Sequence, residues 1–226
     1  DYGHDLYGYD LASTDHATRR RRLAACFGPA YDDHVRLAKD ERTIPFDDRR
    51  FDVVYANQVF EHVRFFDRIV QECARVLKPD GVLLANFPLA TYPVEWHLKI
   101  PFAHWLPPGE LRVRYLQLFY ALGLRPTLPG SSALETARSQ DAYLRDRTYY
   151  RFVNEVLAVA AHHFESCEIE TGQFIQAKLD LLATSDRQAA RWAGSALRLL
   201  HGQVLDNLVT YLFNAAFCLR RPRAKR

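Results

Sequence analysis

The chain has 226 residues, a formal net charge of +3, 48% hydrophobic and 25% charged residues, and no methionine. This composition is ordinary for a globular domain and supports a sizeable core, and the small net charge excludes a general nucleic-acid-binding surface. The four cysteines are far apart and form no C-x-x-C, which excludes a disulfide scaffold and a cysteine zinc site and suits a reducing cytosol. We therefore expect one globular domain, cytoplasmic, with no nucleic-acid partner.

Strands and helices alternate through the first part of the chain. The patterns predict a strand in Asp5–Ala12, a helix over Asp15–Phe27, a strand within His34–Asp48, a strand over Phe51–Ala56, a helix over Phe65–Leu77 ended by Pro79–Gly81, and a strand over Gly81–Pro88. Alternation at this pitch is typical of an α/β fold, a Rossmann-like parallel sheet with flanking helices.

The second part is richer in helices. After an irregular stretch dense in Pro, His and aromatic residues, the patterns predict a helix over Glu110–Leu122, mainly helical structure over Ser131–Phe164, a late strand within Cys167–Leu182, a helix over Asp186–Phe213 and a last strand over Ala215–Pro222. We expect the last strand to be antiparallel and the helices to be insertions. The predicted division is a core at 1–125, an acceptor-binding or lid region at 126–213, and a last strand with a basic tail at 214–226.

Two features bear on membranes. The apolar stretch Leu199–Leu219 contains His201, Gln203, Asp206, Asn207 and Asn214, which make a simple membrane span too costly. The basic tail, Arg220–Arg226, is the candidate for peripheral contact with an anionic membrane. The chain opens on polar, turn-forming residues with no signal peptide, and no oligomeric state is predicted.

Polar side chains follow three of the predicted strands. Asp10 closes the first, Asp40 and Glu41 follow the second, and Asn57 and Gln58 follow the third. Ligands of open parallel sheets bind beyond the carboxyl ends of the strands, where one carboxylate can accept from both hydroxyls of a ribose. We expect these residues to share a nucleoside site. Ordinary turn chemistry is the alternative for Asp10 and Asp40.

Two stretches carry a specific resemblance: IPFDDRRFDVVYANQVFEHV at 44–63 and RVLKPDGVLLANFP at 75–88. The Pro-Phe turn, the FD-V strand, the Glu-His-Val and the Leu-Lys-Pro turn together resemble the class I S-adenosylmethionine-dependent methyltransferases, in the branch often called type 11. The resemblance covers about Asp5 to Leu124. It implies an enzyme that moves a methyl group from S-adenosylmethionine to a small-molecule or lipid- or sugar-linked acceptor.

The resemblance also implies roles for single residues. Asp10 would bind the ribose hydroxyls, Leu11 would pack on adenine, Asp40 with Glu41 beside it would accept from the adenine amine, and Asn57 and Gln58 would line the methionine half. Glu61 and His62 of the Glu-His-Val are expected to cap and orient the next helix, or else to belong to the site.

One family feature is missing. The acid-x-Gly-x-Gly loop that should precede Asp10 is absent, and no G-x-G occurs anywhere. We expect the chain to begin inside the fold, after the first strand and this loop. If the loop is absent from the molecule, the alternative is a methyltransferase-like binding module that has lost its cofactor. A nicotinamide-dependent Rossmann oxidoreductase is the other rival, but it would need G-x-G-x-x-G and, in one large group, Y-x-x-x-K, which is also absent.

Candidate catalytic residues follow the fourth predicted strand. EWHLKIPFAHWLP, at 95–107, resembles the Glu-x-His and His-Trp-Leu-Pro that the same branch often carries there. His97 is the first choice for a base and His104 the second, should the acceptor have to lose a proton. Buried histidines bonded to backbone are the alternative. Glu95, His97 and His104 are poorly spaced for a metal, so none is expected.

Overall fold

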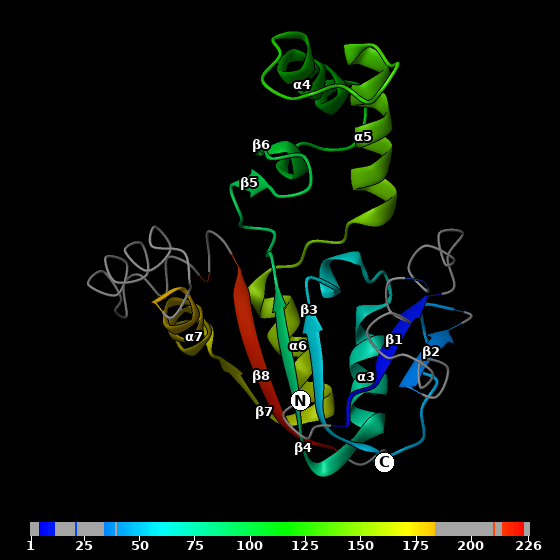
Figure 1. Cartoon of the computed structure of the whole chain (residues 1–226), viewed down its shortest axis with the longest axis vertical. Helices are drawn as coiled ribbons and strands as arrows, with labels where there is room; N and C mark the ends of the chain where they lie inside the picture. Colours follow the sequence, from blue (N-terminus) through cyan, green and yellow to red (C-terminus); the bar gives the residue numbers. More distant parts are fainter. Residues whose placement is uncertain are drawn as a thin grey trace.

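A computed structural model describes residues 5–11, 21, 34–38, 40–183, 210 and 214–223 of the chain. A sheet with helices packed on it forms one part of the molecule, and a smaller helical region stands beyond one edge of that sheet (Figure 1). The predicted helices at 15–27 and 186–213 lie almost wholly outside the described residues.

The main sheet has four strands in the order β3-β4-β8-β7. They are β3 Phe51–Asn57, β4 Leu77–Phe87, β7 Phe164–Ile169 and β8 Ala215–Pro222. β3 and β4 are parallel, while β8 runs antiparallel to both of its neighbours. A separate parallel pair joins β1 Gly8–Leu11 to β2 Val35–Ala38. The α/β fold and the antiparallel last strand are therefore confirmed.

Two helices build the main core against this sheet. α3 Phe66–Val76 has apolar residues at helical spacing, and α6 Val153–His163 packs beside it. Between helices and strands lies one hydrophobic cluster, which includes Phe60, Phe66, Val70, Phe87, Phe164 and Phe217. The ring centroids of Phe60 and Phe87 are 5.6 Å apart at the carboxyl end of β4. This contact packs the segment that follows β3 against the core.

Two local predictions need correction. The predicted turn at Pro79–Gly81 is instead part of β4, which begins directly after α3 at Leu77 and shifts register against β3 between Phe51 and Val53. A Cβ on Gly81 would lie 2.9 Å from the Lys78 carbonyl oxygen, so this irregular strand start requires glycine. Within the predicted late strand, only the first residues are extended, as part of β7, and α7 Thr171–Ala183 takes up the rest.

The chain between β4 and α6 forms the second region, which we call the upper region. Its elements are β5 Val94–Glu95, β6 Ile100–Pro101, the short 3-10 helix η3 Ala103–Trp105, α4 Glu110–Ala121 and α5 Ala133–Arg147. Figure 1 shows it beyond the ends of β3 and β4. It has its own hydrophobic cluster, to which α4 and α5 both contribute, so packing crosses the predicted boundary at 125. The predicted division stays a prediction.

Within the described part of the chain, no helix is long and apolar enough to cross a membrane. The start of the basic tail belongs to the sheet, because Arg220 and Arg221 are residues of β8. They approach Glu168 and Glu165 of β7 at 3.9 and 3.8 Å.

Candidate functional site

The polar segment that follows β3 is tied to the chain that leaves the upper region. It contains the short 3-10 helix η2, Phe60–His62. The Arg151 guanidinium donates to the carbonyls of Phe60 at 2.9 Å, of Val63, and of Tyr149 at 2.7 Å. The Tyr149 N–H in turn donates to the Glu61 carbonyl at 2.7 Å. Burial lowers the pKa of Arg151 to about 10. This clamp fixes the backbone that carries Glu61 and His62.

Glu95 is the hydrogen-bond acceptor at the centre of the site. Its side chain is 0% exposed. Its Oε1 accepts from His97 Nδ1 at 2.7 Å and from the Tyr150 hydroxyl at 2.5 Å, and its Oε2 accepts from the Leu98 N–H at 2.6 Å. Burial alone would raise the pKa of Glu95, but these donors hold it below its ordinary value. Glu95 is therefore a buried carboxylate, and it raises the pKa of His97 through their hydrogen bond.

The rings of His62 and His97 meet through their Nε2 atoms, which are 3.1 Å apart. His62 Nδ1 lies 2.7 Å from the Arg147 carbonyl, which can only accept, so this nitrogen carries a proton. Burial lowers the pKa of His62, so its ring is neutral and its Nε2 holds a lone pair. Glu95 therefore orients the His97 ring that meets His62 at this contact.

Glu61 adds a second carboxyl group to this cluster. It is 2% exposed, and its Oε2 has no hydrogen-bond partner among the described residues. Burial raises its pKa to about 7. Ligand atoms of Glu61, His62 and His97 all lie within 4.8 Å of one another. The expectation that Glu61 and His62 cap the next helix is wrong, because α3 follows Phe65 with no side-chain cap hydrogen bond.

His104 lies on the other side of Tyr150. Their ring centroids are 4.6 Å apart. His104 Nε2 is 3.3 Å from the Ala90 carbonyl, so it carries the proton, and its Nδ1 is buried with no partner among the described residues. Burial lowers the pKa of His104. The ring is thus neutral with an unused lone pair, which is the state of a base ready to take a proton.

The predicted cofactor residues form two groups at strand ends. Asp10, Asp40 and Glu41 all act electrostatically on Tyr9, whose pKa is raised to about 12 by burial, by Cys73 and by these three carboxylates. Asp40 also shows the expected turn chemistry, because its Oδ1 accepts from the Arg42 N–H at 2.7 Å. Leu11 is the last residue of β1, and its side chain is not among those described.

The second group is built on Asn86 of β4. Its Nδ2 donates to Asn57 Oδ1 at 2.9 Å, its carbonyl accepts from the Gln58 N–H at 2.8 Å, and its Oδ1 is buried with no partner among the described residues. Gln58 has a positive φ of 54°. β1 and β3 point to the same edge of the molecule (Figure 1), but no hydrogen bond in the described residues joins the acidic group to the amide group.

Sequence reasoning paired His97 with His104, and the structure brings both against Tyr150. It favoured a helix cap for Glu61 and His62 over membership of the site, and it named Tyr150 only as one of an aromatic run. The signal for Glu61 and His62 was the polar Glu-His pair itself, placed four residues after the end of β3.

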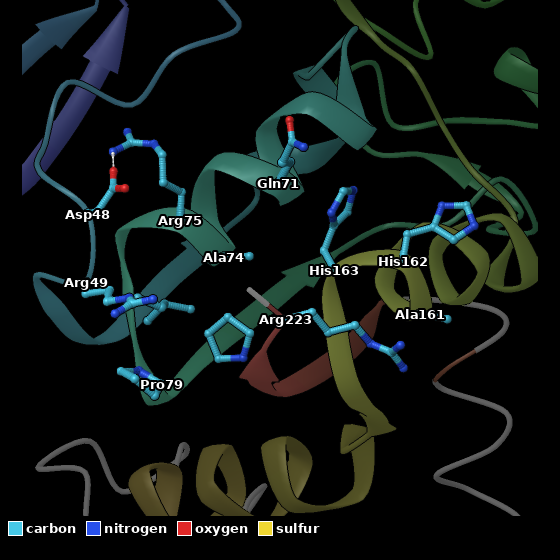
Figure 2. A pocket seen from close by; sticks show the side chains of 12 residues that line it. Asp48, Arg49, Gln71, Ala74, Arg75, Pro79, Ala161, His162, His163 and Arg223 are labelled. Atoms are coloured by element: carbon cyan, nitrogen blue, oxygen red, sulfur yellow. Dashed lines mark hydrogen bonds and ion pairs between the residues drawn. The ribbon is translucent and has the colours of Figure 1, made fainter. Parts of the chain in front are cut away.

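A cavity of about 790 Å³ lies at the opposite edge of the sheet, lined by the residues just before β3, the last turns of α3 and α6, the start of β4 and the end of β8. Figure 2 shows its basic side chains, Arg49, Arg75, His162, His163 and Arg223. Arg75 is paired with Glu72 and Asp48 at 2.8 and 2.6 Å, and His163 with Asp67 at 3.0 Å. None of the predicted site residues lines this cavity.

Comparisons with known proteins give a family and several similar structures. Residues 1–85 match the family model described as a methyltransferase domain. No curated protein matches the chain significantly. Similar solved structures include the (4+2)-cyclase SpnF, at 16% identity and a TM-score of 0.44, where the match covers 97% of this chain and 68% of that one.

Two further structures are similar to a comparable degree. One is a geranyl diphosphate methyltransferase in complex with S-adenosylmethionine, at 15% identity and a TM-score of 0.45, with 99% of this chain and 70% of that one covered. The other is geranyl diphosphate C-methyltransferase from Streptomyces coelicolor A3(2), in complex with Mg²⁺, geranyl diphosphate and S-adenosylhomocysteine. It has 15% identity and a TM-score of 0.44, with 96% of this chain and 64% of that one covered.

Proposed function

We propose the acceptor class and the residues that act, from the premise that residues 1–85 match the methyltransferase-domain model, in agreement with the resemblance to the class I, type 11 enzymes. An S-adenosylmethionine-dependent methyltransferase is the enzyme class, and S-adenosylmethionine is its cofactor. We infer that the methyl group goes to a small molecule, including one linked to a lipid or a sugar, bound between the carboxyl edge of the sheet and the upper region.

The strand-end residues fit the cofactor chemically. Asp10 supplies a carboxylate for the ribose diol, and Asp40 with Glu41 supplies acceptors for the adenine amine. The buried Asn86 Oδ1, which lacks a partner among the described residues, suits the ammonium of the methionine half beside Asn57 and Gln58. When bound, the sulfonium supplies an electrophilic methyl group, and the protein has to place the acceptor in line with it.

The unused lone pair of His104 Nδ1 is the observation that carries the assignment of a base. If the acceptor has to lose a proton on methylation, His104 Nδ1 would take it up. His97 takes a different part in this proposal, because its two ring nitrogens already face Glu95 and His62. It holds Tyr150 and the acceptor side of the site in place.

Calorimetry with S-adenosylhomocysteine on the full chain tests the cofactor site. We expect Asp10→Ala to weaken binding at least tenfold, and Asp52→Ala, at the amino end of β3 where the carboxylate pairs with Lys78 at 2.8 Å, to leave it unchanged. Methyl transfer from labelled donor to a panel of small hydroxyl, amine and lipid-linked acceptors then tests the reaction. Binding of a dinucleotide in place of S-adenosylhomocysteine would indicate the oxidoreductase. Binding of neither ligand would indicate a non-catalytic module.

A further inference from the structure

We propose that Glu61, His62 and His97 bind one divalent transition-metal ion of the zinc type, through Glu61 Oε2 and the two histidine Nε2 atoms. The sequence suggested no metal, because the set it offered was Glu95, His97 and His104. The structure groups the residues differently. Glu95 is a hydrogen-bond partner of His97 Nδ1, and His104 Nε2 bonds to the Ala90 carbonyl. Ligand atoms of Glu61, His62 and His97 lie within 4.8 Å of one another.

Each histidine is oriented as a metal ligand usually is. A ligating histidine donates its second ring N–H to a carbonyl or a carboxylate, which fixes the ring and the tautomer. His62 Nδ1 is 2.7 Å from the Arg147 carbonyl, and His97 Nδ1 is 2.7 Å from Glu95 Oε1. Both rings therefore turn Nε2 towards the same point, with the support of His62 coming from 85 residues away and that of His97 from two residues away.

The spacing of the two Nε2 atoms suits a single ion. Zinc–nitrogen bonds are about 2.0–2.1 Å, so two nitrogens on one tetrahedral ion are about 3.3 Å apart. The observed separation is 3.1 Å. An ion would need the two nitrogens to separate by only a few tenths of an ångström, and the Glu61 oxygen, which lies within 4.8 Å of them, to move closer.

Glu61 supplies an independent observation. Its side chain is 2% exposed and its Oε2 has no partner among the described residues, although the rings of His62 and His97 are beside it. A buried carboxylate oxygen without a donor is costly, and an ion bound to it removes that cost. The clamp of Arg151 on the neighbouring carbonyls holds this carboxylate in place before any ion arrives.

Two histidines and one glutamate leave a fourth position open on a tetrahedral ion. That is the donor set of a catalytic zinc site, in which water or a substrate oxygen fills the last position. The open position would therefore take an oxygen atom of water or of a small oxygen-bearing molecule. Binding of the ion itself requires no methyl donor, so a failed titration with S-adenosylhomocysteine would leave this site standing.

The test uses the untagged full chain, stripped of metal with a chelator and titrated with Zn²⁺ and with Co²⁺. We expect one equivalent of either ion to bind, and Co²⁺ to give the intense visible absorption of a four-coordinate site. Glu61→Gln and His62→Gln should each weaken binding at least 100-fold, and Glu95→Gln should weaken it 10–100-fold through the His97 ring. Thermal unfolding of the metal-free variants shows whether each is folded.

His163→Gln is the matched control, because His163 also pairs with a carboxylate, Asp67, at 3.0 Å but lies at the opposite edge of the sheet. It should bind the ions as the wild type does. If Glu61→Gln does not fold, the binding measurements on His62→Gln and Glu95→Gln test the metal site. Absence of stoichiometric binding overturns the proposal, as does equal binding by the wild type and the folded His62→Gln variant. Loss of binding in His163→Gln instead would place the ion elsewhere and also overturn it.

Discussion

The Tyr150 hydroxyl donates a hydrogen bond of 2.5 Å to Oε1 of Glu95, a carboxylate with no exposed surface. Tyr150→Phe removes this donor and leaves Glu95 with His97 and the Leu98 N–H. Because a hydrogen bond to a buried charge contributes about 1.5–3 kcal/mol, we expect a loss of about that size in the free energy of unfolding, measured with urea.

Tyr149→Phe is the control for that variant. The Tyr149 hydroxyl donates at an exposed site to the Asp146 carbonyl, at 2.9 Å. Its removal should change the free energy of unfolding by no more than about 0.5 kcal/mol. Equal losses in the two variants would contradict the central place given to Glu95.

The upper region depends on a buried ion pair between α4 and α5. Arg112 Nε lies 2.6 Å from Asp141 Oδ1, with 4% and 7% of the two side chains exposed. Asp141→Ala leaves the arginine buried without its partner, so we expect a loss of about 3–5 kcal/mol. Hydrogen exchange should show where stability is lost, because amides in α4 and α5 should exchange faster while those in the main sheet do not.

Glu110→Ala serves as the comparison, since it removes an exposed ion pair with Arg114 in the same helix. Such pairs contribute about 0–1 kcal/mol, so exchange in α5 should not change. Uniformly faster exchange across the main sheet in Asp141→Ala would show that the upper region does not open by itself.

Acid should destabilise the protein partly through Glu72. Burial would raise the pKa of this carboxyl, but hydrogen bonds from Arg75 and the Ile44 N–H hold it below its ordinary value of 4.5. The unfolded state therefore takes up the proton first, so this stabilisation is complete above pH 4.5 and is lost as pH falls through the folded-state pKa. Glu72→Gln should be less stable near neutral pH and should show a flatter loss of stability below pH 4.5.

Urea unfolding at stepped pH values measures this difference. Glu165→Gln is the matched control, because its carboxylate is 58% exposed and only 3.8 Å from Arg221. Its stability should follow the wild-type curve at every pH. If the free energy of unfolding of Glu72→Gln falls with pH in parallel with the wild type below pH 4.5, Glu72 is not a source of the acid destabilisation.

Methyl transfer should depend on pH through His104. Burial holds the pKa of His104 below its ordinary value of 6.5, so the ring is neutral and basic at neutral pH. With an acceptor that must lose a proton, we expect the rate of the chemical step to fall as acid protonates this ring. His104→Gln should lower that rate about 10²–10⁴-fold and remove the acid limb, with binding of S-adenosylhomocysteine unchanged.

The His104→Gln variant has an internal comparison in Trp105→Phe. Trp105 Nε1 donates to the same Ala90 carbonyl at 2.8 Å, but it offers no titrating group. A wild-type pH profile is expected for Trp105→Phe. If both variants lose activity alike and keep the acid limb, His104 supports the loop and is not the base.

Elements with strong local patterns were predictable. Ala215–Pro222 is both the predicted and the observed last strand, because it is an apolar run bounded by arginines and a proline. Helix α3 is found within one residue of its predicted limits, because its apolar residues repeat at helical spacing. Pro79–Gly81 failed as a turn because β4 pairs with β3 on both sides of it, at Leu77 and again from Val82, which local propensity does not encode.

The site was predictable only in part, for a geometric reason. Strand ends mark Asp10, Asp40 and Asn57, and the His-rich loop marks His97 and His104. The role of His62 depends on His97 and Arg147, which are 35 and 85 residues away along the chain. A pattern of neighbours in sequence cannot encode such pairings, so a local reading assigned Glu61 and His62 to a helix cap.

The Arg151 clamp has a consequence for how activity is lost. Its bonds to Phe60 and Val63 span 91 and 88 residues, and they end on carbonyl dipoles, not on a carboxylate. The joint between the upper region and the sheet can therefore loosen without separating an ion pair, while the strands keep their ladder. On warming, activity should be lost at a temperature at which the circular dichroism spectrum is still that of the native fold.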